Sequence, residues 1–321
     1  MTTTVKRSVG NSRTFQTIAV DRLGEELRGD DLLWIDVVQP GDDDVAVLRD
    51  VLKLPPLILE DIPQPHRSAT IRHYGDNLFI IFYALDCPGD DIQRWAVSVY
   101  VTDRYLVTIR LDASHILDDV ADRWKQDVAD IGQRTPITLL YSLLDTMVDS
   151  YFPVLDEIAD RVEDIEDRIL SGTPDGIQAE IIRLRRSLLI TRRIMAAERE
   201  SLVKVFRNDH PMIDGTLLPY FQDVYDHVNR ATETLDGNRE MLASTMDTYL
   251  SSVSNELNVV VRRLTSWTII LMVVTLVASI YGMNFIDMPE LNWRLGYPYA
   301  LGLMVVLLGG MWLVFRRIRW L

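Results

Sequence analysis

Tyr281-Gly282-Met283-Asn284-Phe285 closes an uncharged segment that begins at Leu264, and a second uncharged segment, residues 297–315, follows after a short loop. Each segment is close in length to the ~20 residues that a helix needs to cross the ~30 Å hydrocarbon core of a bilayer. A Gly and an Asn therefore fall where the first membrane helix is expected to end. Two membrane helices joined by a loop that holds Gly-Met-Asn predict the mouth of a pore and the movement of an ion.

The remainder of the chain predicts a soluble body attached to this membrane hairpin. The chain has 321 residues, of which 48% are apolar, and the apolar residues are concentrated near its C-terminal end. Residues 1–11 are polar and lack the apolar core of a secretory signal, so none is expected. The single Cys87 cannot form an internal disulfide, which suits a reducing compartment.

Flanking charges predict the orientation of the hairpin. Basic residues lie before the first membrane segment and after the second, whereas the loop between them carries only one. They are Arg262 and Arg263, then Arg316, Arg317 and Arg319, and in the loop Arg294. By the positive-inside bias, both ends of the chain face the cytoplasm and the loop 286–296 faces outside. The expected location is the cell inner (plasma) membrane, crossed twice.

The formal net charge of −14 argues against a general role in binding nucleic acid, because phosphate contacts need an excess of Lys and Arg. Two interpretations of the acidic excess stay open. It serves solubility, or its negative field attracts divalent cations.

The first third of the chain predicts one mixed α/β domain, residues 1–135. Runs rich in β-branched and aromatic residues predict strands, and two segments between them predict helices. The expected strands are 15–20, 33–38, 77–85, 95–102 and 105–110, and the expected helices are 43–52 and 115–131.

The rest of the chain predicts helices, so the expected fold class is α+β. A helical hairpin is expected over 136–171 and 175–208, with its turn near Gly172. Its first arm is acidic and its second basic, which places Glu163 opposite Arg183 in an antiparallel, charge-matched pair. Exposed pairs of this kind contribute only ~0–1 kcal/mol each, so they align the arms more than they stabilise them.

The longest predicted element runs from about Leu218 to Tyr281 and would span roughly 95 Å. It carries the soluble part into the bilayer without a break, so a change at its far end can be transmitted to the membrane. The expected division is therefore 1–135 for the α/β domain, 136–263 for the helical hairpin and stalk helix, and 264–321 for the membrane hairpin.

A stripe of polar and small residues follows one side of the first membrane helix. Its positions alternate in steps of three and four, the spacing of a helix seam: Asn258, Val261, Thr265, Thr268, Met272, Thr275, Ser279 and Gly282. By itself this seam suits either helix packing or a water-filled lumen. One two-helix hairpin cannot enclose a channel, so a pore requires a ring of subunits, with one seam from each facing the axis.

Such a pore suits a cation that keeps its water shell. Mg²⁺ prefers octahedral oxygen coordination and gives up its water reluctantly, and hydroxyl and amide groups can hydrogen-bond to that shell. Leu264 and Met272 would form apolar rings that gate by dewetting. Neither membrane segment contains a charged residue, so a proton relay through carboxylates has no obvious path.

These motifs together resemble the CorA family of magnesium and cobalt channels. The resemblance is strong from about residue 136 onward and extends to the α/β domain only in outline. It rests on Tyr281-Gly282-Met283-Asn284-Phe285, Met288-Pro289-Glu290-Leu291, Gly296-Tyr297-Pro298, the basic end Arg316-Arg317-Ile318-Arg319-Trp320-Leu321, Tyr220-Phe221-Gln222-Asp223-Val224-Tyr225-Asp226-His227 and Tyr249-Leu250-Ser251-Ser252-Val253-Ser254-Asn255.

The resemblance implies a homopentamer with a funnel-shaped cytoplasmic domain and a pore for hydrated Mg²⁺, Co²⁺ or Ni²⁺. It implies a selectivity filter at Gly282, Met283 and Asn284, and Glu290 in the outer loop as a cation attractor. It also implies a polar ring at Asn258 near the inner mouth.

The resemblance further implies gating by intracellular Mg²⁺ bound between subunits. The family uses a carboxylate on the long helix that matches Asp223, with a partner from the α/β domain, for which Asp86 and Asp90 are both candidates. Asp247 matches a further acidic position on the stalk.

Three other functions have less support in the sequence. A Zn²⁺ transporter of the same architecture stays open, although the scattered histidines and the single Cys predict no zinc cluster. A membrane-anchored scaffold without ion flux would have no use for the hydroxyl seam. An enzyme is not expected, because the sequence holds no phosphate loop, nucleophile motif or metal-hydrolase spacing.

Overall fold

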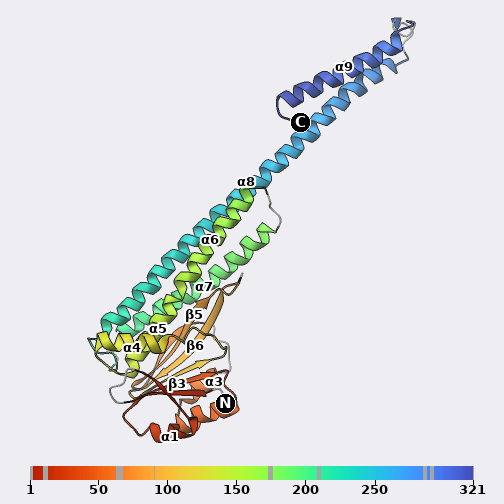
Figure 1. Ribbon diagram of the computed structural model, residues 1–321. Helices are drawn as coiled ribbons and strands as arrows, with labels where there is room; N and C mark the ends of the chain where they lie inside the picture. Colours follow the sequence, from red (N-terminus) through yellow and green to blue (C-terminus); the bar gives the residue numbers. More distant parts are fainter. Residues whose placement is uncertain are drawn as a thin grey trace. The chain divides into compact units, whose positions relative to one another are not determined.

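A seven-stranded mixed sheet forms the N-terminal part of the protein (Figure 1). The computed structural model describes residues 3–9, 14–62, 68–89, 91–172, 176–207, 211–284, 288–289 and 293–320. The strands are β1 Thr3–Ser8, β2 Gln16–Ile18, β3 Leu32–Val38, β4 Thr70–Tyr74, β5 Asn77–Asp86, β6 Gln93–Val101 and β7 Tyr105–Arg110. Their order across the sheet is β2-β1-β3-β7-β6-β5-β4.

Only β3 and β7 run parallel, and every other neighbouring pair is antiparallel. The central strands are buried on both faces, which is why they consist of continuous apolar runs instead of alternating apolar and polar residues. In β5, for example, every residue from Leu78 to Leu85 is buried. Side chains of alternate residues then enter two separate cores.

Short helices cover one face of the sheet, and α4 and α5 cover the other. The first group is η1 Val20–Arg22, α1 Leu23–Glu26, α2 Asp42–Ala46, the π-helical turn η2 Val47–Val51 and α3 Pro56–Asp61. The second is α4 Val120–Ile131 and α5 Pro136–Asp149. Trp124 of α4 is fully buried, and Phe15 joins it to Trp34 of β3 through ring contacts at 4.5 and 5.7 Å.

The predicted helix over 136–171 is two helices, α5 and α6 Tyr151–Leu170. The break falls at Ser150, whose hydroxyl oxygen accepts a hydrogen bond from the backbone N–H of Leu85 at 3.0 Å while its proton goes to the Met147 carbonyl. A serine that bonds to backbone groups in this way competes with the helix's own ladder. The sequence periodicity alone does not reveal this contact with β5.

An antiparallel partner, α7 Ile177–Arg207, follows α6 across the turn at Gly172. Across the turn, Arg168 of the acidic arm pairs with Glu180 of the basic arm at 2.8 Å. The placement of Glu163 opposite Arg183 stays a prediction. Arg192 of α7 reaches Asp236 of the long helix at 2.7 Å. The second arm therefore forms ion pairs with both neighbouring helices, through an acidic side chain toward α6 and a basic side chain toward α8.

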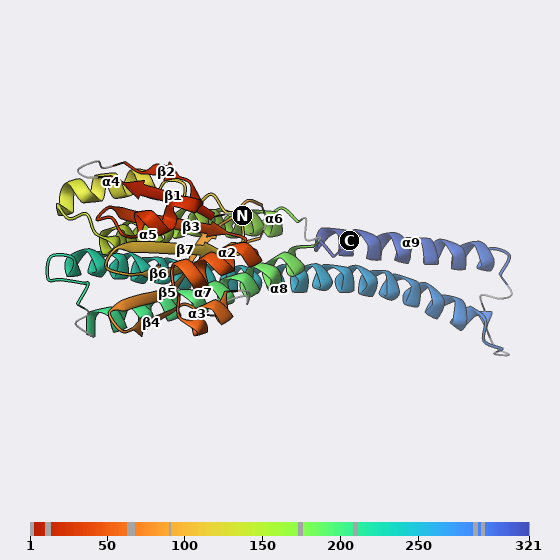
Figure 2. The ribbon, with the colours of Figure 1, turned by 90° about the horizontal axis from the view of Figure 1, so that it is seen from below.

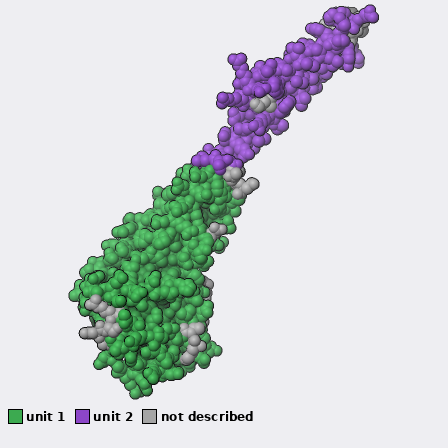
Figure 3. Space-filling model, viewed as in Figure 1, with its two compact units in different colours: residues 1–168, 174–245 green, residues 169–173, 246–321 purple. Residues whose placement is uncertain are grey.

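The last two helices are α8 Leu218–Tyr281 and α9 Gly296–Arg317, and α8 has the predicted bounds. Both are long and apolar enough to cross a membrane. The described chain divides into two compact units (Figure 3), 1–168 with 174–245 and 169–173 with 246–321. The polypeptide passes from the first unit to the second within α8.

The sequence did not predict β1, η1, α1, α3 and β4, and it predicted the helix over 115–131 too long. β1 and β4 are short strands toward the edges of the sheet with charged residues in their sequences, and α3 begins at Pro56, where a loop was expected. Pro is favourable in the first turn of a helix, so Pro55-Pro56 marks a start as well as a break. The helix expected from residue 115 begins only at Val120.

Candidate ion path and metal-binding cluster

The predicted seam lies on the face of α8 that α9 does not cover. Figures 1 and 2 both show α9 beside the C-terminal part of α8. In that part the buried positions of α8 are Ser266, Ile270 and Val277. They lie about 160° around the helix from the mean direction of the seam, at 100° per residue. All seven seam positions from Asn258 to Ser279 are exposed: Asn258, Val261, Thr265, Thr268, Met272, Thr275 and Ser279.

The hydroxyl groups of two seam threonines donate hydrogen bonds to carbonyls of their own helix. Thr268 donates to the Leu264 carbonyl and Thr275 to the Leu271 carbonyl, each at 2.8 Å. Their oxygens therefore present lone pairs to the outside. Water in the shell of a cation points its protons outward, so a wall of acceptors is the complementary surface. The exposed side chain of Leu264 stands beside this seam.

The predicted filter residues follow directly after the last turn of α8. The Gly282 N–H bonds to the carbonyls of Ala278 and Ser279 at 3.0 and 3.2 Å, and the backbone then leaves the helix. A Cβ at position 282 would lie 3.3 Å from the Ala278 oxygen, a tight contact that Gly avoids. Met283 and Asn284 are exposed beyond the helix end. Glu290 lies outside the described residues.

Three ligand-bearing side chains meet near the start of α8. Asp145 and Asp149 come from the end of α5, His227 comes from α8, and one ligand atom of each lies within 4.8 Å of the others. We call these three residues the Asp-Asp-His cluster. His227 Nδ1 lies 3.6 Å from Asp145 Oδ1 and 4.0 Å from Asp149 Oδ1. Its other ring nitrogen, Nε2, lies 3.8 Å from Oδ1 of the predicted regulatory residue Asp223.

The second oxygens of both carboxylates are held by one guanidinium. Arg123 of α4 contacts Oδ2 of Asp145 and Oδ2 of Asp149. Asp145 is only 2% exposed, and burial raises the pKa of its carboxyl to about 6 against the lowering effect of Arg123. Within the described residues, Asp145 Oδ1 and His227 Nδ1 are buried and have no hydrogen-bond partner. Two such atoms facing each other fit a proton or a metal ion.

The ligand atoms of the Asp-Asp-His cluster are suited to bind a metal ion. Carboxylate oxygens suit Mg²⁺, whereas an imidazole nitrogen favours ions such as Co²⁺, Ni²⁺ and Zn²⁺. The outer contacts are similar to those of metal sites: Arg123 holds the second oxygens of both carboxylates, and Asp223 lies 3.8 Å from the second nitrogen of His227. Arg123 opposes a cation by its charge, so a bound ion would share the two carboxylates with it.

The other predicted regulatory residues lie outside this cluster. Asp86 is exposed at the end of β5, where its Oδ1 accepts from the Cys87 N–H at 2.8 Å. Asp247 is exposed on α8 beside an open hollow lined by Ile169, Leu170, Thr248, Ser251, Ser252 and Asn255. Asp90 lies outside the described residues.

Sequence reasoning missed Arg123, Asp145, Asp149 and His227 as site residues. The histidines and the single Cys were expected to form no zinc cluster, and that stays a prediction; His227 meets two carboxylates instead of other histidines. The available signal was a pair of side chains four residues apart on each of two helices, Asp145 with Asp149 and Asp223 with His227. Such pairs share a helix face, yet nothing in the sequence shows that the two faces meet.

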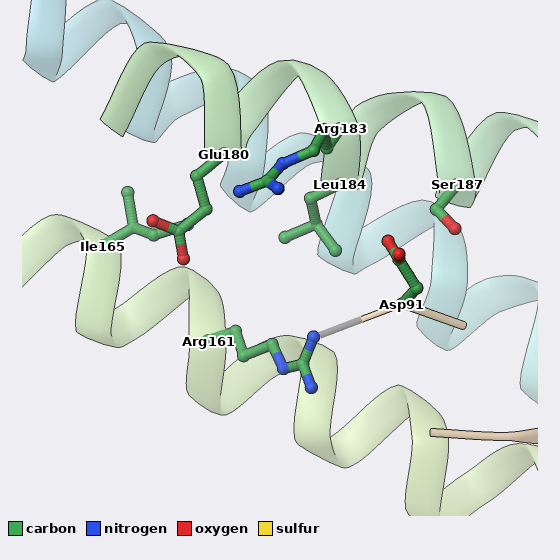
Figure 4. Close-up of a pocket in the computed structure, with 7 residues that line it drawn as sticks. All are labelled: Asp91, Arg161, Ile165, Glu180, Arg183, Leu184 and Ser187. Atoms are coloured by element: carbon green, nitrogen blue, oxygen red, sulfur yellow. The ribbon is translucent and has the colours of Figure 1, made fainter. Parts of the chain in front are cut away.

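A small polar cavity of about 40 Å³ lies between α6, α7 and the connection before β6 (Figure 4). Its lining residues are Asp91, Arg161, Ile165, Glu180, Arg183, Leu184 and Ser187. Its two acidic and two basic side chains balance, and its volume is far below the ~300 Å³ of a small ligand pocket. Its size suits water molecules.

Comparisons with known proteins agree over nearly the whole chain. A family model described as CorA-like Mg²⁺ transporter protein matches residues 29–317. The cobalt/magnesium transport protein CorA of Thermotoga maritima is 31% identical over 317 residues, which cover 98% of this chain and 90% of that protein. The complete structure of the CorA magnesium transporter from Methanocaldococcus jannaschii matches with a TM-score of 0.82 and 25% identity, covering 100% of this chain and 99% of that one.

A more distant structure shares the fold alone. The cytoplasmic domain of ZntB from Vibrio parahaemolyticus matches with a TM-score of 0.59 and 11% identity, covering 79% of this chain and 100% of that domain.

Proposed function

We propose that this chain, which belongs to the CorA family of Mg²⁺ transporters, forms a channel that conducts hydrated Mg²⁺ into the cytoplasm. Co²⁺ and Ni²⁺ share the octahedral hydrated state and are proposed as further cargo. The relative from Thermotoga maritima is named for cobalt and magnesium transport, which supports Mg²⁺ and Co²⁺ as cargo.

The observation that carries the proposal is the exposed seam of α8. The hydroxyl and amide side chains of this helix face away from α9, the other apolar helix among the described residues. They need another partner along that face. Lipid gains nothing from those groups. A water-filled lumen can hydrogen-bond to them. Because Thr268 and Thr275 donate their hydroxyl protons to helix carbonyls, their oxygens are acceptors for the water shell of a cation.

A closed ring of subunits is part of the proposal, and we propose a homopentamer with a funnel-shaped cytoplasmic part. In such a ring Gly282, Met283 and Asn284 surround the outer mouth as the filter, and Glu290 attracts cations from outside. Asn258, Val261, Thr265, Thr268, Thr275 and Ser279 line the pore, while Leu264 and Met272 form its apolar gate.

We place both chain termini in the cytoplasm and the loop 286–296 outside, in the plasma membrane. The two apolar helices support a membrane protein. The orientation rests on the arginines that flank them. We also retain residues 1–135, 136–263 and 264–321 as the functional division of the chain.

For gating, we propose regulatory binding of intracellular Mg²⁺ between subunits, with Asp223 as a ligand. Asp86 or Asp90 of a neighbouring subunit is the proposed partner, and Asp247 is a further candidate. The Asp-Asp-His cluster adjoins Asp223 through His227, so it would add donors to this region. Carboxylates gathered without a cation repel one another, and a bound cation offsets that repulsion and favours the closed ring.

Zn²⁺ transport is the second candidate function. The fold is shared with a ZntB domain, and the Asp-Asp-His cluster contains an imidazole ligand that suits Zn²⁺. A cargo ion that keeps its water shell does not need such ligands, so the cluster favours Zn²⁺ only as a regulator. The filter motif and the more similar relatives favour Mg²⁺.

Mg²⁺ uptake into liposomes that contain the purified chain tests the proposal. We expect uptake driven by membrane potential, its loss in Asn284→Ala, and its retention in the matched control Asn255→Ala, which changes an exposed amide on α8 before the membrane segment. Entry of Zn²⁺ alone, at a rate set by a proton gradient, would replace the proposal with the second candidate. Absence of any flux would support a scaffold.

A further inference from the structure

Part of the edge of β5 is completed by side chains instead of a strand. On one side of β5, β4 pairs as far as Ile81, and among the described residues β6 is the only strand that pairs with β5 beyond that point. The backbone groups of Tyr83 and Leu85 on this open edge are met by Glu198, Tyr151 and Ser150. These side chains come from α7, the first residue of α6 and the α5–α6 break.

Three oxygens at this edge form a chain of short contacts. The Tyr151 hydroxyl oxygen lies 2.7 Å from the Tyr83 carbonyl oxygen and 2.8 Å from Glu198 Oε2. The other carboxyl oxygen, Glu198 Oε1, accepts the Tyr83 N–H at 2.9 Å. Tyr151 and Glu198 are both completely buried.

The number of protons available to these three oxygens identifies the protonation state of Glu198. The Tyr151 hydroxyl has one proton, and the Tyr83 carbonyl has none to offer, so that proton belongs on the contact to Tyr83. The contact between Tyr151 and Glu198 then needs a proton of its own. Because Oε1 already accepts an N–H, this second proton belongs on Oε2.

We propose that Glu198 is a proton-binding site: as a neutral acid it donates from Oε2 to Tyr151, which donates to Tyr83, and this chain fastens α6 and α7 to the edge of β5. An ionised Glu198 would take the Tyr151 proton and leave the Tyr83 carbonyl facing a lone pair at 2.7 Å. Proton release therefore unfastens the two helices from the sheet.

The surroundings of Glu198 agree with the neutral form. Burial raises its pKa to about 8, against the lowering effect of its contacts with the Tyr151 side chain and the Tyr83 backbone. The Tyr151 pKa is also raised by burial and by Glu198, so the phenol does not supply a charge. Among the described residues, no cationic side chain contributes to the Glu198 pKa.

The sign of the pH dependence follows from this shift. The folded pKa of about 8 lies above the ordinary value of 4.5, so the folded chain holds the proton more tightly than the unfolded chain. The contribution to stability is complete below the ordinary value and is lost as pH rises to about 8. Between those values the unfolding equilibrium constant rises about tenfold per pH unit from this group.

Infrared spectroscopy of the full chain in detergent tests the proposal directly. At pH 7 we expect a protonated-carboxyl C=O band that is absent from Glu198→Gln and present in the control Asp145→Asn. A wild-type spectrum without that band, or a band that Glu198→Gln leaves unchanged, would overturn the proposal.

Stability against pH gives a second, independent test. Gln offers the same acceptor and donor as the neutral acid and does not titrate, so Glu198→Gln should fold and should lose the alkaline weakening between pH 6 and 8. Tyr151→Phe should destabilise the chain at pH 6, where Glu198 in the folded chain is neutral and both hydrogen bonds of Tyr151 are formed. A Glu198→Gln chain that fails to fold, or keeps the wild-type pH profile, would contradict the neutral acid.

Discussion

Lowering the pH from 7 to 5 should weaken metal binding at the Asp-Asp-His cluster about tenfold. The Asp145 pKa of about 6 leaves its carboxyl ~90% ionised at pH 7 and ~10% ionised at pH 5. A metal must displace this proton, so the apparent affinity follows the ionised fraction. In excess metal, a tenfold weaker affinity lowers the stabilisation by about 1.4 kcal/mol.

The assay is urea unfolding of the full chain in detergent, followed by Trp fluorescence, with and without Co²⁺ at each pH. The difference made by Co²⁺ at one pH removes the pH dependence of the fold itself. Asp145→Asn should lose most of the Co²⁺ stabilisation at pH 7, whereas Asp160→Asn, an exposed carboxylate on α6, should keep it. Equal stabilisation by Co²⁺ at pH 7 and pH 5, or wild-type behaviour in Asp145→Asn, would refute the assignment.

Three further predictions follow from the same structure. Arg123→Met should lower the free energy of unfolding without metal by about 3 kcal/mol, because it leaves a buried carboxylate unpaired; a urea midpoint close to wild type would contradict this. Asp223→Asn should blunt inhibition of uptake by Mg²⁺ in the compartment facing the cytoplasmic domain, and unchanged inhibition would remove Asp223 from the gating proposal. The double variant Thr268→Val and Thr275→Val should slow Mg²⁺ uptake several-fold by removing acceptors, while Ser266→Ala on the covered face should leave it unchanged; equal rates in all three proteins would argue against the seam.

The helical half of the fold was predictable because its signals are local. Hydrophobic periodicity and the absence of breakers gave α8 its bounds, and two uncharged segments of membrane length marked α9 and the end of α8. The central strands were equally predictable, because burial on both faces of the sheet requires continuous apolar runs. β1 and β4 were missed because their charged residues reflect positions toward the edge of the sheet, which only the assembled sheet defines.

The candidate sites divide in the same way. The seam and the Gly282–Asn284 turn follow from spacing along one helix, so sequence located them. The meeting of Asp145 with His227 depends on how α5 packs beside α8, and the pairing of Glu198 with Tyr83 depends on where β4 stops. No local sequence pattern predicts either of these contacts. Burial, which gives both carboxyls their raised pKa values, is likewise a property of the folded chain.

The central claim is that one face of α8 lines an ion path. It is tested most directly with single cysteines in a Cys87→Ser background, which has no other thiol. Thr275→Cys lies on the seam, and Leu271→Cys is exposed about 90° around the helix from the mean direction of the seam. We expect a positively charged methanethiosulfonate reagent to block Mg²⁺ uptake through Thr275→Cys and to leave Leu271→Cys unaffected. Block of Leu271→Cys with Thr275→Cys unaffected, or equal block of both, would contradict the seam as the pore lining.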